Sequence, residues 1–256
     1  MVLIDTHCHL QMKTFKDDIE RVVDDAIASG IEAIINVGFD VKSSEKAVEL
    51  SRKYPFMFAA VGIHPHDAKM YNSNTLADLN DFLNEEKVIA IGEIGLDFYR
   101  NLSPPEVQER VFSEQLFFAK EKDIQVILHI RDAYTRVFEI IEKEKPKKVV
   151  LHCFSGSVDD AKRGIAMGFY ISFAGNITYS QGRLTDAARE VPLTSMLIET
   201  DAPFLPPIPY RGKRNEPCFI KYTVEKLAEI KDVSVEDVAH ITTNNAQTFF
   251  WGAIHG

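Results

Sequence analysis

Short apolar runs rich in β-branched residues alternate along the chain with longer segments of helical periodicity. Eight such runs occur, at residues 2–6, 33–37, 57–61, 88–92, 124–128, 148–151, 169–173 and 196–200. Their nearly continuous apolar character is typical of strands that are covered on both faces, as in a parallel sheet. The alternation therefore predicts an α/β protein, a (β/α)8 TIM barrel with extra C-terminal helices. A doubly wound open sheet is the second choice.

The segments between the apolar runs carry helix start signals. Ser103 and Pro104 are predicted as the N-cap and first residue of a helix that continues over 105–122. Ser234 with Asp237 resembles a capping box, which predicts the start of a C-terminal helix.

Neither a linker nor a low-complexity tract interrupts the pattern. The proline-rich stretch 203–217 is interpreted as a loop after the eighth strand, so residues 1–256 are predicted to form a single domain. That length is common for a barrel of eight βα units.

The excess of acidic over basic residues disfavours some classes of binding partner. A net charge of −9 argues against broad, nonspecific adhesion to nucleic acid or to an anionic membrane. It leaves a phosphate substrate open, because bound cations and a local basic loop can reverse the field inside a cleft.

Cysteine usage and hydropathy predict the compartment. Three cysteines form no disulfide framework, and their odd number fits a reducing environment. No basic region precedes an apolar run in the first residues, so a signal peptide is not expected, and no apolar stretch approaches the roughly 20 residues of a membrane span. A cytoplasmic protein without membrane contact is expected.

Metal-binding residue types recur where the predicted strands end. They are His7, His9, Glu93, His129, His152 and Asp201. In a parallel barrel these ends converge on one rim, and burying six such groups without an ion would be costly. Four imidazoles and two carboxylates favour Zn, Mn, Fe or Co over a purely oxygen-ligated Mg or Ca site. Six ligands exceed what one catalytic ion takes, so two ions that share Glu93 are predicted.

Other common chemistries lack their motifs. The chain has no G-x-S-x-G elbow, no phosphate-binding G-x-x-x-x-G-K-[ST] and no G-x-G-x-x-G after a strand. Serine-nucleophile, ATP and NAD chemistry are therefore disfavoured, and no organic cofactor is expected.

Several motifs together resemble the TatD family of metal-dependent deoxyribonucleases. They are the segments 5–10 (DTHCHL), 62–66 (GIHPH), 92–97 (GEIGLD), 129–133 (HIRDA), 152–156 (HCFSG), 199–203 (ETDAP) and 211–217 (RGKRNEP). They occur in the order typical of the family and cover essentially the whole chain.

The resemblance implies a TIM-type barrel with a two-metal centre that cleaves DNA phosphodiesters, often as a 3′-to-5′ exonuclease. Single-stranded DNA ends are the expected substrate and a monomer the expected state. The cofactors implied are two divalent cations per chain, Zn, Mn or Mg. One ion would be held by His7, His9, Glu93 and Asp201, and the other by Glu93, His129 and His152.

Catalytic roles follow as hypotheses. Asp201 would orient the attacking water and accept its proton, while Glu93 would set the distance between two ions that activate the water. The candidates for phosphate contacts are His64, Arg131, Arg211, Lys213, Arg214 and Asn215.

Three alternative functions remain open at this stage. An amidohydrolase acting on an amide, lactone or nucleobase would share the barrel, but many such enzymes bridge their ions with a lysine where this chain has Glu93. Ester cleavage on aminoacyl-tRNA is a second alternative. A noncatalytic scaffold is the third, and it predicts erosion of the ligand set, which the sequence does not show.

Overall fold

The computed structural model describes residues 1–252, which fall into two compact units. The first unit combines Met1–Asn36 with Cys153–Gly256, and the second is Val37–His152. The single domain predicted for 1–256 stays a prediction, and its last four residues lie outside the described part of the chain.

The first unit contains two pairs of parallel strands. They are β1 (Leu3–Cys8) with β2 (Ile31–Val37), and β7 (Tyr170–Phe173) with β8 (Met196–Ile198). A further parallel bridge joins Cys8 to Ala202, just beyond β8. The chain segments that follow β1 and β8 are therefore side by side, which determines where the functional side chains of this unit meet.

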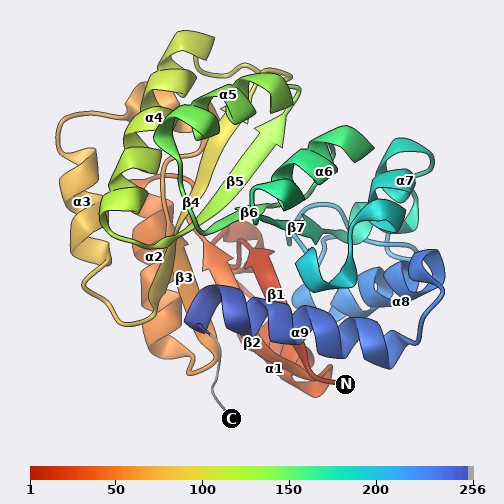
Figure 1. Cartoon of the computed structure of the whole chain (residues 1–256). Helices are drawn as coiled ribbons and strands as arrows, with labels where there is room; N and C mark the ends of the chain where they lie inside the picture. The colour runs from red at the N-terminus through yellow and green to blue at the C-terminus, as the bar shows by residue number, and fades with distance from the viewer. Residues whose placement is uncertain (253–256) are drawn as a thin grey trace. The chain divides into compact units, whose positions relative to one another are not determined.

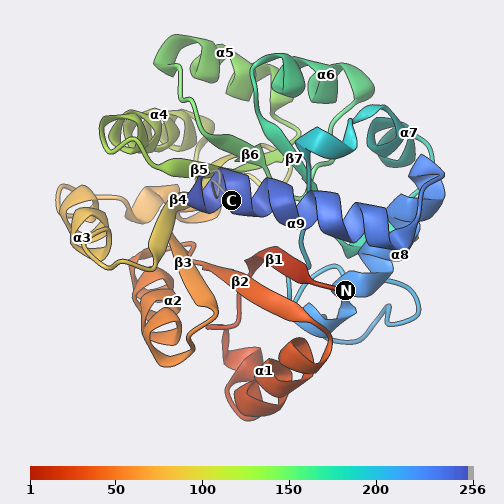
Figure 2. The same ribbon diagram turned by 60° about the horizontal axis from the view of Figure 1, so that its bottom comes forward.

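Helix α9 lies at the opposite end of these strands. The helices of the unit are α1 (Ile19–Ala28), α6 (Val158–Ala166), α7 (Arg183–Glu190), α8 (Ile220–Lys231) and α9 (Val235–Trp251). The Asn245 amide donates to the carbonyls of Leu193 and Met196, and the Thr243 hydroxyl donates to the carbonyl of Val2. In Figure 2 the blue helix α9 accordingly passes the start of β1. This packing leaves the carboxyl ends of β1 and β8 to the loops.

The second unit is a four-stranded parallel sheet with its helices alongside. Its strands are β3 (Met57–Val61), β4 (Val88–Asp97), β5 (Gln125–Arg131) and β6 (Val149–Leu151), paired in chain order. Its helices are α2 (Val41–Lys53), α3 (Thr75–Phe82), α4 (Pro105–Glu121) and α5 (Tyr134–Glu144). In Figure 1, α2, α4 and α5 lie along β3, β4 and β5. Most residues of these strands are buried, as their apolar runs predict.

Each of the eight predicted runs contains a strand, but β1, β2, β4 and β5 are longer than expected. β1 continues to Cys8, so His7 lies inside it. β4 continues to Asp97 and β5 to Arg131, so Glu93 and His129 lie inside strands rather than after them. The chain stays extended through Gly95, which has a φ of +145° and passes so close to the His129 backbone that a side chain there would clash. The pairing of β4 with β5 also shifts register between Ile91 and Ile94, on either side of Glu93.

The two predicted helix starts have different outcomes. Ser234 caps α9 and accepts the Asp237 N–H at 3.0 Å, as predicted. Ser103 does not cap α4, because Pro104 is the N-cap and the helix begins at Pro105. The Ser103 hydroxyl instead donates to the carbonyl of His66 at 2.8 Å. Within residues 1–252, the helices are too short or too polar to cross a membrane.

Candidate metal centre

A first cluster of metal-binding side chains lies where β1 and β8 end. His7 and His9 alternate with Cys8 and therefore point the same way, so that their Nε2 atoms lie 3.2 Å apart. The Asp201 carboxylate lies 3.4 Å from the Nε2 of His9 and 3.9 Å from that of His7. Both histidines are buried and Asp201 is slightly exposed. Three potential ligands therefore face one small volume.

Backbone hydrogen bonds hold this first cluster together. The Asp201 N–H donates to the carbonyl of His7 at 2.9 Å, and the His9 N–H donates to that of Ala202 at 2.7 Å. These bonds continue the parallel bridge beside β1. The positions of the three side chains therefore follow from main-chain pairing rather than from contacts among flexible side chains.

Asp5 lies beneath the first cluster and joins the same two segments. Its carboxylate accepts hydrogen bonds from the Thr200 N–H at 2.9 Å, from the Thr200 hydroxyl at 2.5 Å and from the His7 N–H at 3.3 Å. Burial raises the pKa of Asp5 to about 7, although these hydrogen bonds act in the opposite direction. Asp5 is fully buried, so it positions the cluster and does not reach solvent.

A second cluster surrounds Glu93 in the other unit. One Glu93 carboxylate oxygen lies 2.7 Å from Nδ1 of His129, 2.8 Å from Nε2 of His152 and 3.5 Å from Nε2 of His64. The candidate ligand atoms of His64, Glu93 and His129 all lie within 4.8 Å of one another. Three imidazoles therefore share one carboxylate.

Electrostatics in the second cluster favour the cation-binding forms of Glu93 and His64. For His129, burial lowers the pKa and hydrogen bonds to Asp97 and Glu93 raise it, with a net rise. Burial alone would raise the pKa of Glu93, but His152, His64 and His129 together lower it well below its usual value. Burial lowers the pKa of His64 well below its ordinary value, against the attraction of Glu93. An ionised carboxylate and a neutral imidazole are the states in which these groups bind a metal.

Asp97 and His66 belong to this cluster and were not singled out from the sequence. One oxygen of Asp97 lies 2.8 Å from Nε2 of His66 and 3.3 Å from Nε2 of His129. Burial would raise the pKa of Asp97, but hydrogen bonds from these imidazoles lower it. The available signals were a second His-x-His, at 64–66, and the aspartate that ends GEIGLD. A carboxylate in this place orients an imidazole ligand.

The donor set of each cluster fits a divalent cation. Imidazole nitrogens and carboxylate oxygens are the ligands of Zn, Mn and related ions. In the first cluster, two buried imidazole nitrogens face each other beside a carboxylate. In the second, an ionised carboxylate is shared among imidazoles. A cation would satisfy the electron pairs that converge in both places.

Three of the residues predicted to contact substrate have positively charged side chains that are exposed or half-buried. They are Arg131, Arg211 and Lys213. The Arg131 guanidinium lies 4.0 Å from the ring centroid of Tyr99, and that of Arg211 lies 4.2 Å from the centroid of Tyr179. Lys213 is exposed at the end of the same loop as Arg211. Contact of these residues with a substrate stays a prediction.

The other three candidates are engaged within the protein. Arg214 pairs with Asp18 at 2.6 Å and with Glu216 at 2.7 Å. Asn215 is fully buried, and its amide donates to the carbonyls of two residues of the preceding loop. His64 lies within the second cluster. Their predicted substrate contacts stay untested, and the contacts of Arg214 and Asn215 point to structural roles.

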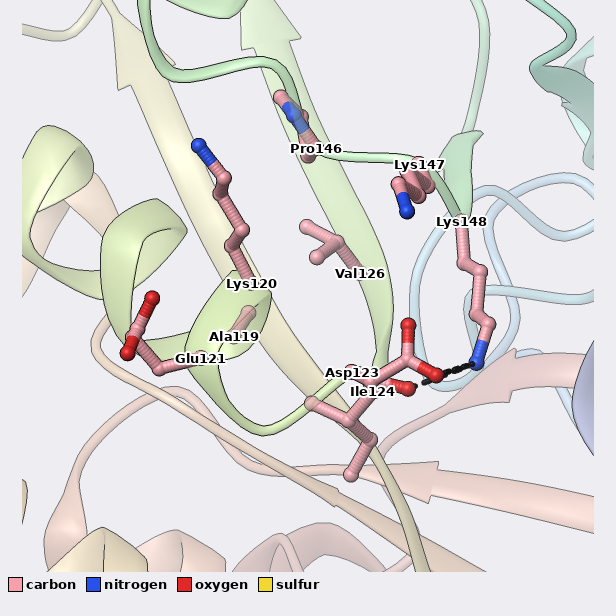
Figure 3. A pocket seen from close by; sticks show the side chains of 9 residues that line it. All are labelled: Ala119, Lys120, Glu121, Asp123, Ile124, Val126, Pro146, Lys147 and Lys148. Carbon is pink, nitrogen blue, oxygen red and sulfur yellow. Dashed lines mark hydrogen bonds and ion pairs between the residues drawn. The ribbon is translucent and has the colours of Figure 1, made fainter.

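A hollow of about 210 Å³ in the second unit lies away from these side chains, beside the first residues of β5 and β6 (Figure 3). Lys148 bonds to Asp123 at 3.0 Å across its floor, and the Lys120 ammonium donates to the carbonyl of Glu144. The hollow lies beside the first residues of β5 and β6. His129 lies near the carboxyl end of β5, and His152 directly follows β6. The hollow is therefore separate from the second cluster.

Comparison with known sequences shows which protein family this chain matches. A family model described as TatD related DNase matches residues 4–251. The chain is 41% identical to "Uncharacterized metal-dependent hydrolase YabD" of Bacillus subtilis, over 97% of this chain and 99% of that protein. It is 33% identical to "3′-5′ ssDNA/RNA exonuclease TatD" of Escherichia fergusonii, over 97% of this chain and 98% of that protein.

The same likeness appears among solved structures. The crystal structure of the TatD homologue YJJV from Escherichia coli superposes with a TM-score of 0.92 at 32% identity, over 97% of each chain. A TatD family hydrolase from Entamoeba histolytica gives a TM-score of 0.91 at 22% identity and shows the fold alone. The predicted fold class is thereby confirmed, as a (β/α)8 barrel of parallel strands alternating with helices.

Proposed function

Since this chain belongs to the family of TatD-related DNases, we propose that it is a metal-dependent phosphodiesterase that removes nucleotides from the 3′ ends of single-stranded DNA. The observation that carries the proposal is the pair of buried imidazole and carboxylate clusters, one beyond β1 and β8 and one around Glu93. The relative from E. fergusonii, named as a 3′-5′ exonuclease on single-stranded DNA and RNA, supports the substrate class.

Each cluster would hold one divalent cation. His7, His9 and Asp201 would hold the first, and His129 and His152 would hold the second together with Glu93. As predicted from the sequence, Glu93 would also serve the first ion. When bound, such cations lower the pKa of water and offset the charge of the phosphate.

The residues of the chain divide the remaining tasks. Asp201 would orient the attacking water and accept its proton, because its side chain is 13% exposed and those of His7 and His9 are almost fully buried. Asp5 and Asp97 would hold the histidines in place. Arg131 and Arg211 present planar cations suited to phosphate oxygens.

Nucleotide release from a 3′-labelled single-stranded oligonucleotide tests this proposal. Digestion is expected with Mg, Mn or Zn and none with a chelator. Asp201→Asn should lower turnover by at least about 100-fold, because it removes the proton acceptor. Asn tolerates the left-handed backbone of this position (φ 56°) as Asp does, so the fold should survive.

Asp24→Asn, at an exposed position on α1, is the matched control and should digest the oligonucleotide at the wild-type rate. Metal-independent digestion would contradict the proposal. So would normal turnover of Asp201→Asn, or cleavage confined to carboxylic esters and amides.

A further inference from the structure

Phe204 is a large apolar side chain exposed beside the first cluster. It lies three residues after Asp201, and its side chain is 48% exposed. Its ring meets that of His9 edge to face, with centroids 6.0 Å apart and an interplanar angle of 70°. A phenyl ring that is about half exposed is unfavourable in water, and its exposed surface is available to an aromatic partner.

The loop holds Phe204 in this position. The Phe204 N–H donates to the carbonyl of Asp201 at 2.8 Å, and its own carbonyl accepts the buried amide of Asn215 at 2.7 Å. Further along, the Ile208 N–H donates to the hydroxyl of Thr178 at 2.9 Å. The ring is therefore presented by a braced segment, which limits the conformational entropy that a ligand would have to remove.

A second aromatic side chain with a cation follows on the neighbouring segment. Tyr179 is half-buried, and the Arg211 guanidinium covers its ring at 4.2 Å. Burial raises the pKa of the Tyr179 phenol, the Arg211 charge lowers it, and the nearby Asp201 carboxylate raises it. The first cluster is thus accompanied by an exposed phenyl ring and by an arginine held on an aromatic ring, which suits an aromatic anion.

We propose that Phe204, together with the Tyr179–Arg211 pair, forms a subsite for an unpaired nucleobase and its phosphate. The inference rests on the proposed function and deepens it. Every nucleobase has a π-face, so stacking on Phe204 tolerates any sequence. A base inside a duplex has both faces stacked, and a terminal base is held to its complementary strand, whereas an unpaired base is free to turn onto the ring. The subsite therefore selects single-stranded ends, and Arg211 holds the adjoining phosphate.

Base stacking is measured directly with an oligonucleotide that carries 2-aminopurine at its 3′ end, in the presence of chelator so that nothing is cleaved. Wild-type protein should quench the fluorescence on binding. Phe204→Ala should abolish the quenching and weaken binding about tenfold. Phe204→Trp should retain both effects, whereas Phe204→Leu, which is apolar but not flat, should not.

Two controls separate stacking from a general loss of structure. Phe117→Ala removes another exposed phenyl, 55% accessible on α4, and should behave as wild type. An oligonucleotide with an abasic 3′ residue should bind the wild type and Phe204→Ala equally. Equal quenching by wild type and Phe204→Ala would overturn the subsite, as would an equal loss of affinity for both oligonucleotides.

The two proposals fail in different ways. Quenching by a wild-type protein that releases no nucleotide when given metal would refute the nuclease and leave the subsite intact. Nucleotide release without any effect of Phe204→Ala would refute the subsite and leave the nuclease intact. A wild-type protein that neither binds nor quenches would overturn the subsite.

Discussion

Asp97 is placed to act on the proposed metal site through its neighbours. Its carboxylate touches the imidazoles of His66 and His129 on the side away from Glu93, so it sets the orientation of a ligand. Asp97→Asn should lower affinity for Mn or Zn by about 10- to 100-fold, because the amide cannot supply the charge. Calorimetric titration measures the change. Asp81→Asn, an exposed substitution on α3, should leave affinity unaltered. Unaltered affinity in Asp97→Asn would exclude the positioning role.

Residue types could be predicted from the sequence more readily than their partners. His7, His9 and Asp201 lie close together as expected. The sequence indicates both the alternation of side chains along β1 and the end of the strand before Asp201. The contact of His64 with phosphate stays a prediction, and its position beside Glu93 is a contact that the sequence does not indicate. Asp97 was overlooked, because the strand that carries it was predicted to end at residue 92. Tertiary contacts decided these cases, and no local pattern records them.

At the scale of elements, the loop after β8 contains two arginines with different surroundings. Arg211 is exposed over Tyr179, whereas Arg214 is held by Asp18 and Glu216. Arg211→Gln should weaken oligonucleotide binding and reduce its salt dependence by about one phosphate contact, with stability unchanged. Arg214→Gln should instead lower the free energy of unfolding by roughly 1–3 kcal/mol. Salt-dependent binding and urea denaturation distinguish the two, and exchanged phenotypes would contradict these assignments.

The cost of Arg214→Gln should depend on pH. Hydrogen bonds from Arg214 and Arg21 lower the pKa of Asp18. Burial would raise the pKa of Glu216, but the same two guanidinium groups lower it. Carboxylates whose pKa is lowered in the folded state stabilise it above their unfolded values, about 4, and lose that contribution as the pH falls. Urea denaturation should therefore show a large difference between variant and wild type at pH 7 and a shrinking one below about pH 4. A constant difference would exclude this ionic origin.

Strand positions were predictable because each apolar run is covered on both sides, whereas strand and helix ends were less so. β4 extends past Gly92 through a register shift that only its pairing with β5 reveals. The predicted N-cap of α4 is Ser103, but the N-cap in the structure is Pro104, because the Ser103 hydroxyl donates to the carbonyl of His66 instead. The residues at which strands and helices end depend on long-range contacts, which the periodic pattern of the sequence does not indicate.

At the scale of the whole molecule, an acidic chain concentrates its chemistry in two buried clusters. The net charge of −9 offers little general attraction to DNA. Binding would then depend on a few arginines and aromatic side chains near the clusters, and bound cations would add to it. The proposed two-metal centre therefore depends on the number of cations that each chain binds.

Metal content after equilibrium dialysis against Mn or Zn measures that number most directly. The wild type should retain two ions per chain, and His9→Ala and His129→Ala should each retain about one. His240→Ala, an exposed histidine on α9, should retain two. A wild type that holds one ion or none, or cluster variants that hold as many as His240→Ala, would contradict the proposed two-metal centre.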